Sequence, residues 1–90
     1  MSRENDIVAT GLDLPEGPTL LKDGSVAFTQ QRRGEVSVLR NNRVETISRS
    51  AGSPNAVTLG PDGSLYVAQN GGVVGDWRAS EQARPGVERV

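Results

Sequence analysis

Two residues with oxygen-donating side chains occupy matching places in this sequence and are its best candidates for chemistry. Glu16 lies in the segment LPEGP (residues 14–18), and Asn55 follows a proline 39 positions further on. A carboxylate and an amide carbonyl are hard oxygen ligands, which suit Ca²⁺, Mg²⁺ or Mn²⁺. Each also has a plainer interpretation. Glu16 fits a solvated turn residue between two prolines, and Asn55 fits half of a common Pro-Asn turn.

Other kinds of site find little support. The chain has no Cys and no His, which excludes thiolate and imidazole metal sites, a Cys nucleophile and a His-based triad. The two Asp-Gly-Ser segments lack the spacing of a calcium-binding loop and fit hairpin turns better. No G-x-S-x-G sequence supports a serine hydrolase. Trp77, the only tryptophan, is predicted either to cap a bound ligand from a loop or to pack against a neighbouring unit.

Composition narrows the class of protein. Ten basic and eleven acidic residues among 90 give a net charge of −1, which predicts no nucleic-acid partner. No apolar run is long enough for a membrane span, so no membrane partner is expected. The first residues lack the basic-then-apolar pattern of a signal peptide, and a cytoplasmic location is expected. With 34% apolar and 3% aromatic residues, a self-sufficient core is doubtful.

An internal repeat organises the chain. Residues 15–30 (PEGPTLLKDGSVAFTQ) align without a gap with residues 54–69 (PNAVTLGPDGSLYVAQ). A repeat of about 40 residues with only strand and turn signals predicts the blades of a β-propeller, each a four-stranded antiparallel sheet. In a blade the first strand lines the central channel, and Glu16 and Asn55 lie just before the first strands. The two side chains are therefore expected to point into one axial site.

The repeat predicts an all-β chain of about one and a half blades. Residues 1–10 form an N-terminal tail, 11–50 the first blade and 51–90 an incomplete second blade. The second blade carries about 13 extra residues before its third strand, where the chain stops. Because a propeller needs at least four blades to close, the remaining blades are expected from a longer chain or from other chains. Strands are expected at residues 18–21, 26–30, 36–39, 44–47, 57–59, 65–68 and 86–90.

These segments resemble the gluconolactonase / regucalcin (senescence marker protein) family. The resemblance covers residues 11–90 and rests on PEGP, DGSLYVA and GG…PGVERV. It implies a six-bladed propeller, of which this chain is the N-terminal portion, that hydrolyses sugar lactones. The implied cofactor is a divalent cation (Ca²⁺, Mg²⁺, Mn²⁺ or Zn²⁺) that polarises the lactone carbonyl and activates water.

The resemblance also assigns roles to residues. Glu16 matches the Glu of the family's EGP motif, a metal ligand. Asn55 matches the Asn of an NG motif and becomes a substrate-binding candidate, with Ala56 standing where many relatives have Gly. Trp77 is a substrate-binding candidate from its place on a loop and not from the resemblance. The family's general base and other ligands belong to later blades, so no catalytic residue is expected in this chain, which alone is expected to be inactive. Two alternatives remain open. One is a non-catalytic propeller that binds a ligand or a protein, and the other is an inactive fragment.

Overall fold

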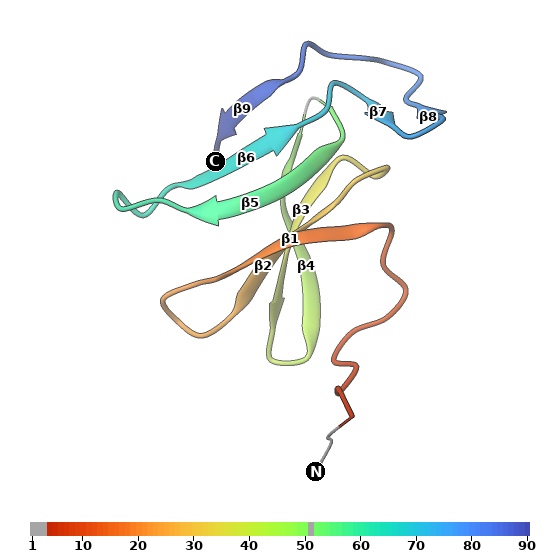
Figure 1. Cartoon of the computed structure of the whole chain (residues 1–90). Helices are drawn as coiled ribbons and strands as arrows, with labels where there is room; N and C mark the ends of the chain where they lie inside the picture. The colour runs from red at the N-terminus through yellow and green to blue at the C-terminus, as the bar shows by residue number, and fades with distance from the viewer. Residues whose placement is uncertain (1–3, 51) are drawn as a thin grey trace.

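The computed structural model describes residues 4–50 and 52–90, and all of their regular structure is β-strand. The described residues contain no helix, and so none that could cross a membrane. Residues 1–3 of the expected tail, and residue 51 at the expected start of the second unit, lie outside the described residues. The strands form two main antiparallel sheets and one small hairpin (Figure 1).

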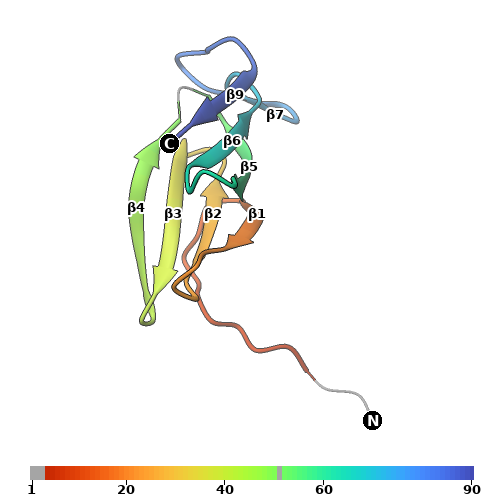
Figure 2. The same ribbon diagram turned by 90° about the vertical axis from the view of Figure 1, so that its left-hand side faces the viewer.

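The first sheet has four strands in chain order. They are β1 (Pro15–Leu20), β2 (Val26–Gln30), β3 (Glu35–Arg40) and β4 (Arg43–Arg49). β1 and β4 lie at opposite edges, and β4 is largely exposed, as its polar sequence predicts (Figure 2). The turn between β3 and β4 has positive φ at Asn41 and Asn42 (51° and 62°), a conformation that asparagine tolerates.

The second sheet has three strands, β5 (Pro54–Leu59), β6 (Leu65–Gln69) and β9 (Gly86–Arg89). The two predicted Asp-Gly turns close in the same way. The Leu21 N–H donates to the Ser25 carbonyl and the Gly60 N–H donates to the Ser64 carbonyl, both at 2.8 Å. The sequence repeat is therefore also a structural repeat.

Two details differ from the expectation. The first strand of each unit begins earlier than expected, β1 at Pro15 rather than at residue 18 and β5 at Pro54 rather than at residue 57. Glu16 and Asn55 therefore lie inside these strands and not before them. A bulge between Glu16 and Thr19 lets the edge strand β1 pair on both sides of Gly17 and Pro18. The extra residues of the second unit contain two short strands that the sequence did not predict, because β7 (Val73–Val74) and β8 (Trp77–Arg78) pair as a hairpin.

The core lies between the two sheets. It contains Ala27, Val36 and Val38 from the first sheet, and Val57, Leu65 and Val67 from the second. β5 contacts β1, β2 and β3, so the first strand of the second sheet packs across the first sheet. This packing places the beginnings of β1 and β5 side by side, where the candidate metal ligands lie.

Candidate functional site

The two sheets come close together at Gly17 and Ala56, which are equivalent positions of the repeat. A Cβ atom on Gly17 would overlap the Cα and Cβ atoms of Ala56 and would lie 3.0 Å from the Asn55 carbonyl oxygen. Gly17 also has a φ of +49°, which favours glycine. Glycine therefore lets β1 touch β5 immediately beside Glu16 and Asn55.

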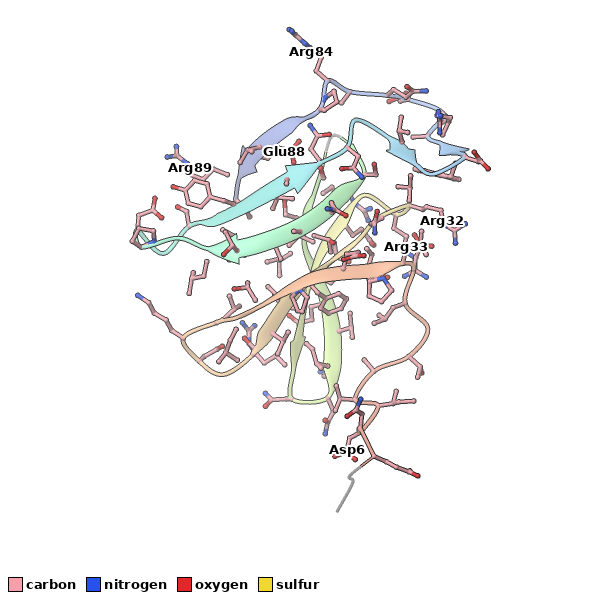
Figure 3. All side chains as sticks on the ribbon, in the orientation of Figure 1. Asp6, Arg32, Arg33, Arg84, Glu88 and Arg89 are labelled. Carbon is pink, nitrogen blue, oxygen red and sulfur yellow. The ribbon has the colours of Figure 1, made fainter. Side chains whose placement is uncertain are left out.

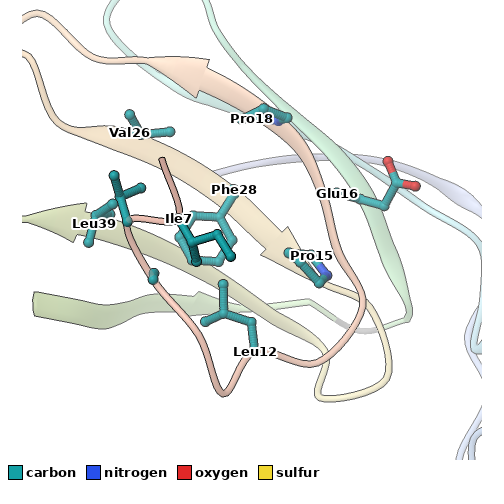
Figure 4. Close-up of a pocket in the computed structure, with 10 residues that line it drawn as sticks. Ile7, Leu12, Pro15, Glu16, Pro18, Val26, Phe28 and Leu39 are labelled. Atoms are coloured by element: carbon teal, nitrogen blue, oxygen red, sulfur yellow. The ribbon is translucent and has the colours of Figure 1, made fainter. Parts of the chain in front are cut away.

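Glu16 is exposed on β1 and its backbone is fixed. Its Cα position pairs with Thr29 of β2, and its carbonyl accepts a hydrogen bond from the Thr29 hydroxyl at 3.2 Å. The Glu16 side chain projects away from Phe28 (Figure 4). Its carboxylate has no hydrogen bond or ion pair with the described residues 4–50 and 52–90. The carboxylate is held on a rigid strand and is free to bind a ligand.

Asn55 is exposed on β5, within an irregularity between Pro54 and Ala56 that matches the bulge of β1. Its side-chain amide has no hydrogen-bond partner in the part of the chain that the structure describes. β1 and β5 thus each present a side-chain oxygen next to the Gly17–Ala56 contact. Among the described residues neither oxygen has a hydrogen-bond partner, so each can act as a metal ligand.

These two side chains suit a hard divalent cation as part of a ligand set. A carboxylate and an amide oxygen have the donor chemistry that Ca²⁺, Mg²⁺ and Mn²⁺ favour. Among the described residues, however, no group of three or more acidic, His or Cys side chains could hold a metal ion. Glu16 and Asn55 can therefore supply only some of the ligands.

Trp77 lies in a different place, at the hairpin of the second unit. It is half-buried and lines a polar cavity of about 240 Å³ together with the β2–β3 turn of the first unit. The cavity wall includes Arg32, Arg33, Ser53 and Ser80. The tryptophan thus packs beside the neighbouring unit, and it also borders a space large enough for a small ligand.

Arg32 and Arg33 of this cavity are functional candidates that the sequence analysis did not identify. Asp13 holds their turn in place. Its carboxylate accepts hydrogen bonds from Arg32 Nε and from the Arg33 N–H, both at 3.0 Å. Figure 3 shows Arg32 and Arg33 on the side of the molecule that carries β7 and β8. The inserted residues stand in the second unit where the first unit has its β2–β3 turn. The repeat could therefore have predicted that Arg32 and Arg33 lie near the β7–β8 hairpin.

The back of the first sheet carries an apolar pocket of about 330 Å³. Phe28, Val26 and Leu39 form its floor, and residues 7–9 and Leu12 of the N-terminal segment border it (Figure 4). Glu16 contributes to its rim. Glu16 and Trp77 therefore line separate cavities, and the structure does not bring the three predicted site residues into one pocket.

The Asp-Gly-Ser segments are turns, as predicted. Hydrogen bonds from the Ser25 hydroxyl and N–H lower the pKa of the Asp23 carboxyl. The Ser64 N–H, at 3.0 Å, and the Tyr66 hydroxyl, at 2.9 Å, both donate to Asp62 and lower its pKa. The hydrogen bond from the Tyr66 hydroxyl to Asp62 also raises the pKa of Tyr66 above its ordinary value of 10.0. Both aspartates are occupied in closing hairpins and are not arranged as cation ligands.

A scan against models of protein families finds no match to this chain, and a search of the curated proteins finds none either. Among solved structures, the chain is similar to an oxidoreductase from Thermus thermophilus that is provisionally named a glucose dehydrogenase. The TM-score is 0.70 at 20% sequence identity. The match covers 93% of this chain and 26% of that protein. This likeness concerns the fold alone, and the chain spans about a quarter of the length of its structural neighbour.

Proposed function

We propose that this chain is the N-terminal part of a six-bladed β-propeller that hydrolyses sugar lactones with the help of a divalent cation. The observation that carries the proposal is the junction at Gly17 and Ala56, which sets the unpaired Glu16 carboxylate and the Asn55 amide on adjoining first strands. A module that only binds partners through its outer surface has no need of a carboxylate at this inner edge.

Three further observations support a propeller. The two sheets are repeats of one another, they stack face to face, and their first strands adjoin while β4 lies at the far edge. The Thermus protein shares this arrangement over 93% of the chain, and its name indicates a sugar substrate. A stack of two such sheets cannot close a ring, so further blades complete the proposed protein.

Each candidate residue has a proposed role. Glu16 is a metal ligand, whose charge partly balances that of the cation, and Asn55 binds the substrate by hydrogen bonds. Trp77 lines a separate cavity with Arg32 and Arg33, so its proposed role is to contact only a substrate long enough to extend from the cation to that cavity. The bound cation would polarise the lactone carbonyl and promote its attack by water. The general base and the remaining metal ligands come from blades outside this chain.

The test is acid release from glucono-lactone by the protein expressed from its complete reading frame, with and without a chelator. We expect chelator-sensitive turnover in the wild type and its loss, by about 10²-fold or more, in Glu16→Gln, since a neutral amide is a weaker cation ligand. Glu45→Gln is the matched control, because Glu45 is also an exposed glutamate and lies on β4. Turnover that ignores the chelator, or that survives in Glu16→Gln, contradicts the proposal.

The name of the Thermus protein supports a second candidate, a sugar dehydrogenase. Oxidation differs from hydrolysis because it requires an electron acceptor. An artificial acceptor dye added with glucose would be reduced by a dehydrogenase and not by a lactonase. Binding of sugar with neither acid release nor dye reduction would identify a non-catalytic binding module.

A further inference from the structure

The insert of the second unit forms one wall of the polar cavity beside Trp77. The repeat does not require this insert, because the first unit connects β2 to β3 with a short turn in the same place. The cavity of about 240 Å³ lies between the β7–β8 hairpin of the insert and the β2–β3 turn. Both walls belong to the two units of this chain, so no further blade is needed to form the cavity.

Hydrogen bonds fix the wall that carries Trp77. The buried Gln69 side chain accepts a hydrogen bond from the Gly71 N–H at 2.6 Å and donates one to the Arg84 carbonyl at 2.7 Å. Gln69 therefore ties together the two ends of the insert, and the β7–β8 pairing closes the hairpin between them. A wall that is ordered before a ligand arrives lowers the entropy cost of binding.

Asp13 fixes the opposite wall. Its carboxylate accepts hydrogen bonds from Arg32 Nε and from the Arg33 N–H, both at 3.0 Å, and its side chain is only 15% exposed. The charge of Arg32 is therefore balanced. The Arg33 guanidinium has no hydrogen bond or ion pair with residues 4–50 and 52–90, so it is available to donate hydrogen bonds to a ligand.

The lining of the cavity suits a neutral sugar ring better than an anion. Glu81 also lines the cavity, so the positive charge of Arg33 is offset there by a negative one. Arginine donates hydrogen bonds and a carboxylate accepts them, and each hydroxyl group of a sugar can do both. Trp77 adds an aromatic surface on which the apolar face of a sugar ring can stack.

The cavity also lies near the candidate cation site. Ser53 lines the cavity and precedes Asn55 by two residues, which span at most about 7 Å of extended chain. Gln31 lines it as well and directly follows β2, the strand that pairs with Glu16. A ring in the cavity and a ring at Glu16 and Asn55 are thus close enough to be linked units of one ligand.

We propose that this cavity binds a neutral glycosyl unit, so that the substrate is the lactone of an oligosaccharide rather than of a single sugar. The sugar site rests on the cavity alone, whereas its place in the substrate rests on the proposed lactonase function. The lactone ring lies at Glu16 and Asn55, and the next ring stacks on Trp77 and accepts hydrogen bonds from Arg33.

Calorimetry with sugars that contain no lactone tests the cavity. The protein from its complete reading frame is titrated with cellobiose, with maltose and, as a charged probe, with gluconate, all in the presence of a chelator. We expect at least one disaccharide to bind, because the cavity does not use the cation. Trp77→Ala and Arg33→Ala should each weaken this binding about tenfold or more, by loss of the aromatic surface or of a charged donor.

Arg43→Ala is the matched control, because Arg43 is also an exposed arginine and lies at the β3–β4 turn, away from the cavity. Circular dichroism checks the fold, and Trp77→Phe, which keeps an aromatic ring, should retain most of the binding. Should Trp77→Ala unfold, Arg33→Ala decides. The sugar site is overturned if neither disaccharide binds, if gluconate binds instead, or if Arg33→Ala binds like the wild type.

Acid release separates this inference from the proposed function. We expect a kcat/KM for the lactone of the bound disaccharide about tenfold or more above that for glucono-lactone, and Arg33→Ala should bring the two values together. Equal values in the wild type would overturn the oligosaccharide substrate and leave the lactonase function intact. Disaccharide binding without hydrolysis of either lactone would confirm the sugar site and overturn the lactonase function.

Discussion

Asp62 and Tyr66 show how a single residue acquires a property that its sequence position does not reveal. Asp62 closes the turn through the Ser64 N–H, and it also accepts a hydrogen bond from the Tyr66 hydroxyl at 2.9 Å. The equivalent of Tyr66 in the first unit is Ala27, so Asp23 pairs instead with Arg40, at 3.1 Å. The repeat predicts the turn, but only the structure identifies the partner of each carboxylate.

This pair makes a prediction about pH. Tyr66 has a raised pKa, so its bond stabilises the fold below the ordinary pKa of 10.0 and this contribution is lost as pH rises through the raised value. Asp62 has a lowered pKa, so its contribution is present above 3.8 and is lost as pH falls. We expect Asp62→Asn to lower the pKa of Tyr66 toward 10.0. Ultraviolet titration measures this directly, since Tyr66 is the only tyrosine.

Asp76→Asn is the matched control for that titration, because Asp76 is an exposed aspartate in the β7–β8 turn and makes no contact with Tyr66 among the described residues. The ultraviolet titration curve of Tyr66 in Asp76→Asn should overlay that of the wild type. An Asp62→Asn variant that leaves the tyrosine curve unmoved would show that the hydrogen bond is not formed in solution.

At the scale of elements, the local sequence predicts which segments form strands and turns better than it predicts where those elements begin and end. Asp-Gly and Asn-Asn readily adopt the backbone conformations that tight turns need. Each lies in a turn, as the sequence predicted for Asp-Gly. The start of β1 was misplaced because two prolines argue against a strand. An edge strand tolerates them, because proline has no N–H to donate and β1 is paired with a neighbouring strand on one side only. The β7–β8 hairpin has only two residues on each strand, too few for an alternating pattern.

The contact between β1 and β5 gives a prediction about stability. Gly17→Ala should destabilise the protein by about 1–3 kcal/mol more than Gly24→Ala, because the new methyl group overlaps Ala56. Both glycines have positive φ, but a Cβ on Gly24 meets nothing within 4 Å, so that variant reports the backbone effect alone. Urea unfolding measures both free energies. Equal losses would mean that the two sheets do not meet at Gly17 in solution.

For the whole molecule, the sequence predicted more of the architecture than of the site. Repeated apolar positions predict two stacked sheets, and the structure has them. The site depends on which residues meet across units. The Gly17–Ala56 contact brings together the strands that carry Glu16 and Asn55, whereas Trp77 lines a separate cavity with Arg32 and Arg33. Contacts between units can be inferred only by comparing the two repeats and not from either local sequence alone.

The incomplete set of metal ligands at Glu16 and Asn55 gives a prediction about activity. At concentrations where the chain is monomeric, we expect no acid release from glucono-lactone above the uncatalysed rate, because Glu16 and Asn55 are too few ligands to hold a cation firmly. A pH-stat assay with and without added Mn²⁺ checks this. Chelator-sensitive turnover by the monomer would show that the described residues complete a site by themselves.

The most direct measurement for the proposed cation site is paramagnetic line broadening by Mn²⁺ in the isotopically labelled chain. Even weak binding broadens nearby signals, so an incomplete ligand set is sufficient. We predict that the Asn55 side-chain amide and the Gly17 and Ala56 amides broaden first, and that Glu16→Gln removes the effect while Glu45→Gln does not. Broadening that begins at the Asp23 or Asp62 turns instead, or that persists in Glu16→Gln, would contradict a cation site at the junction of the first strands.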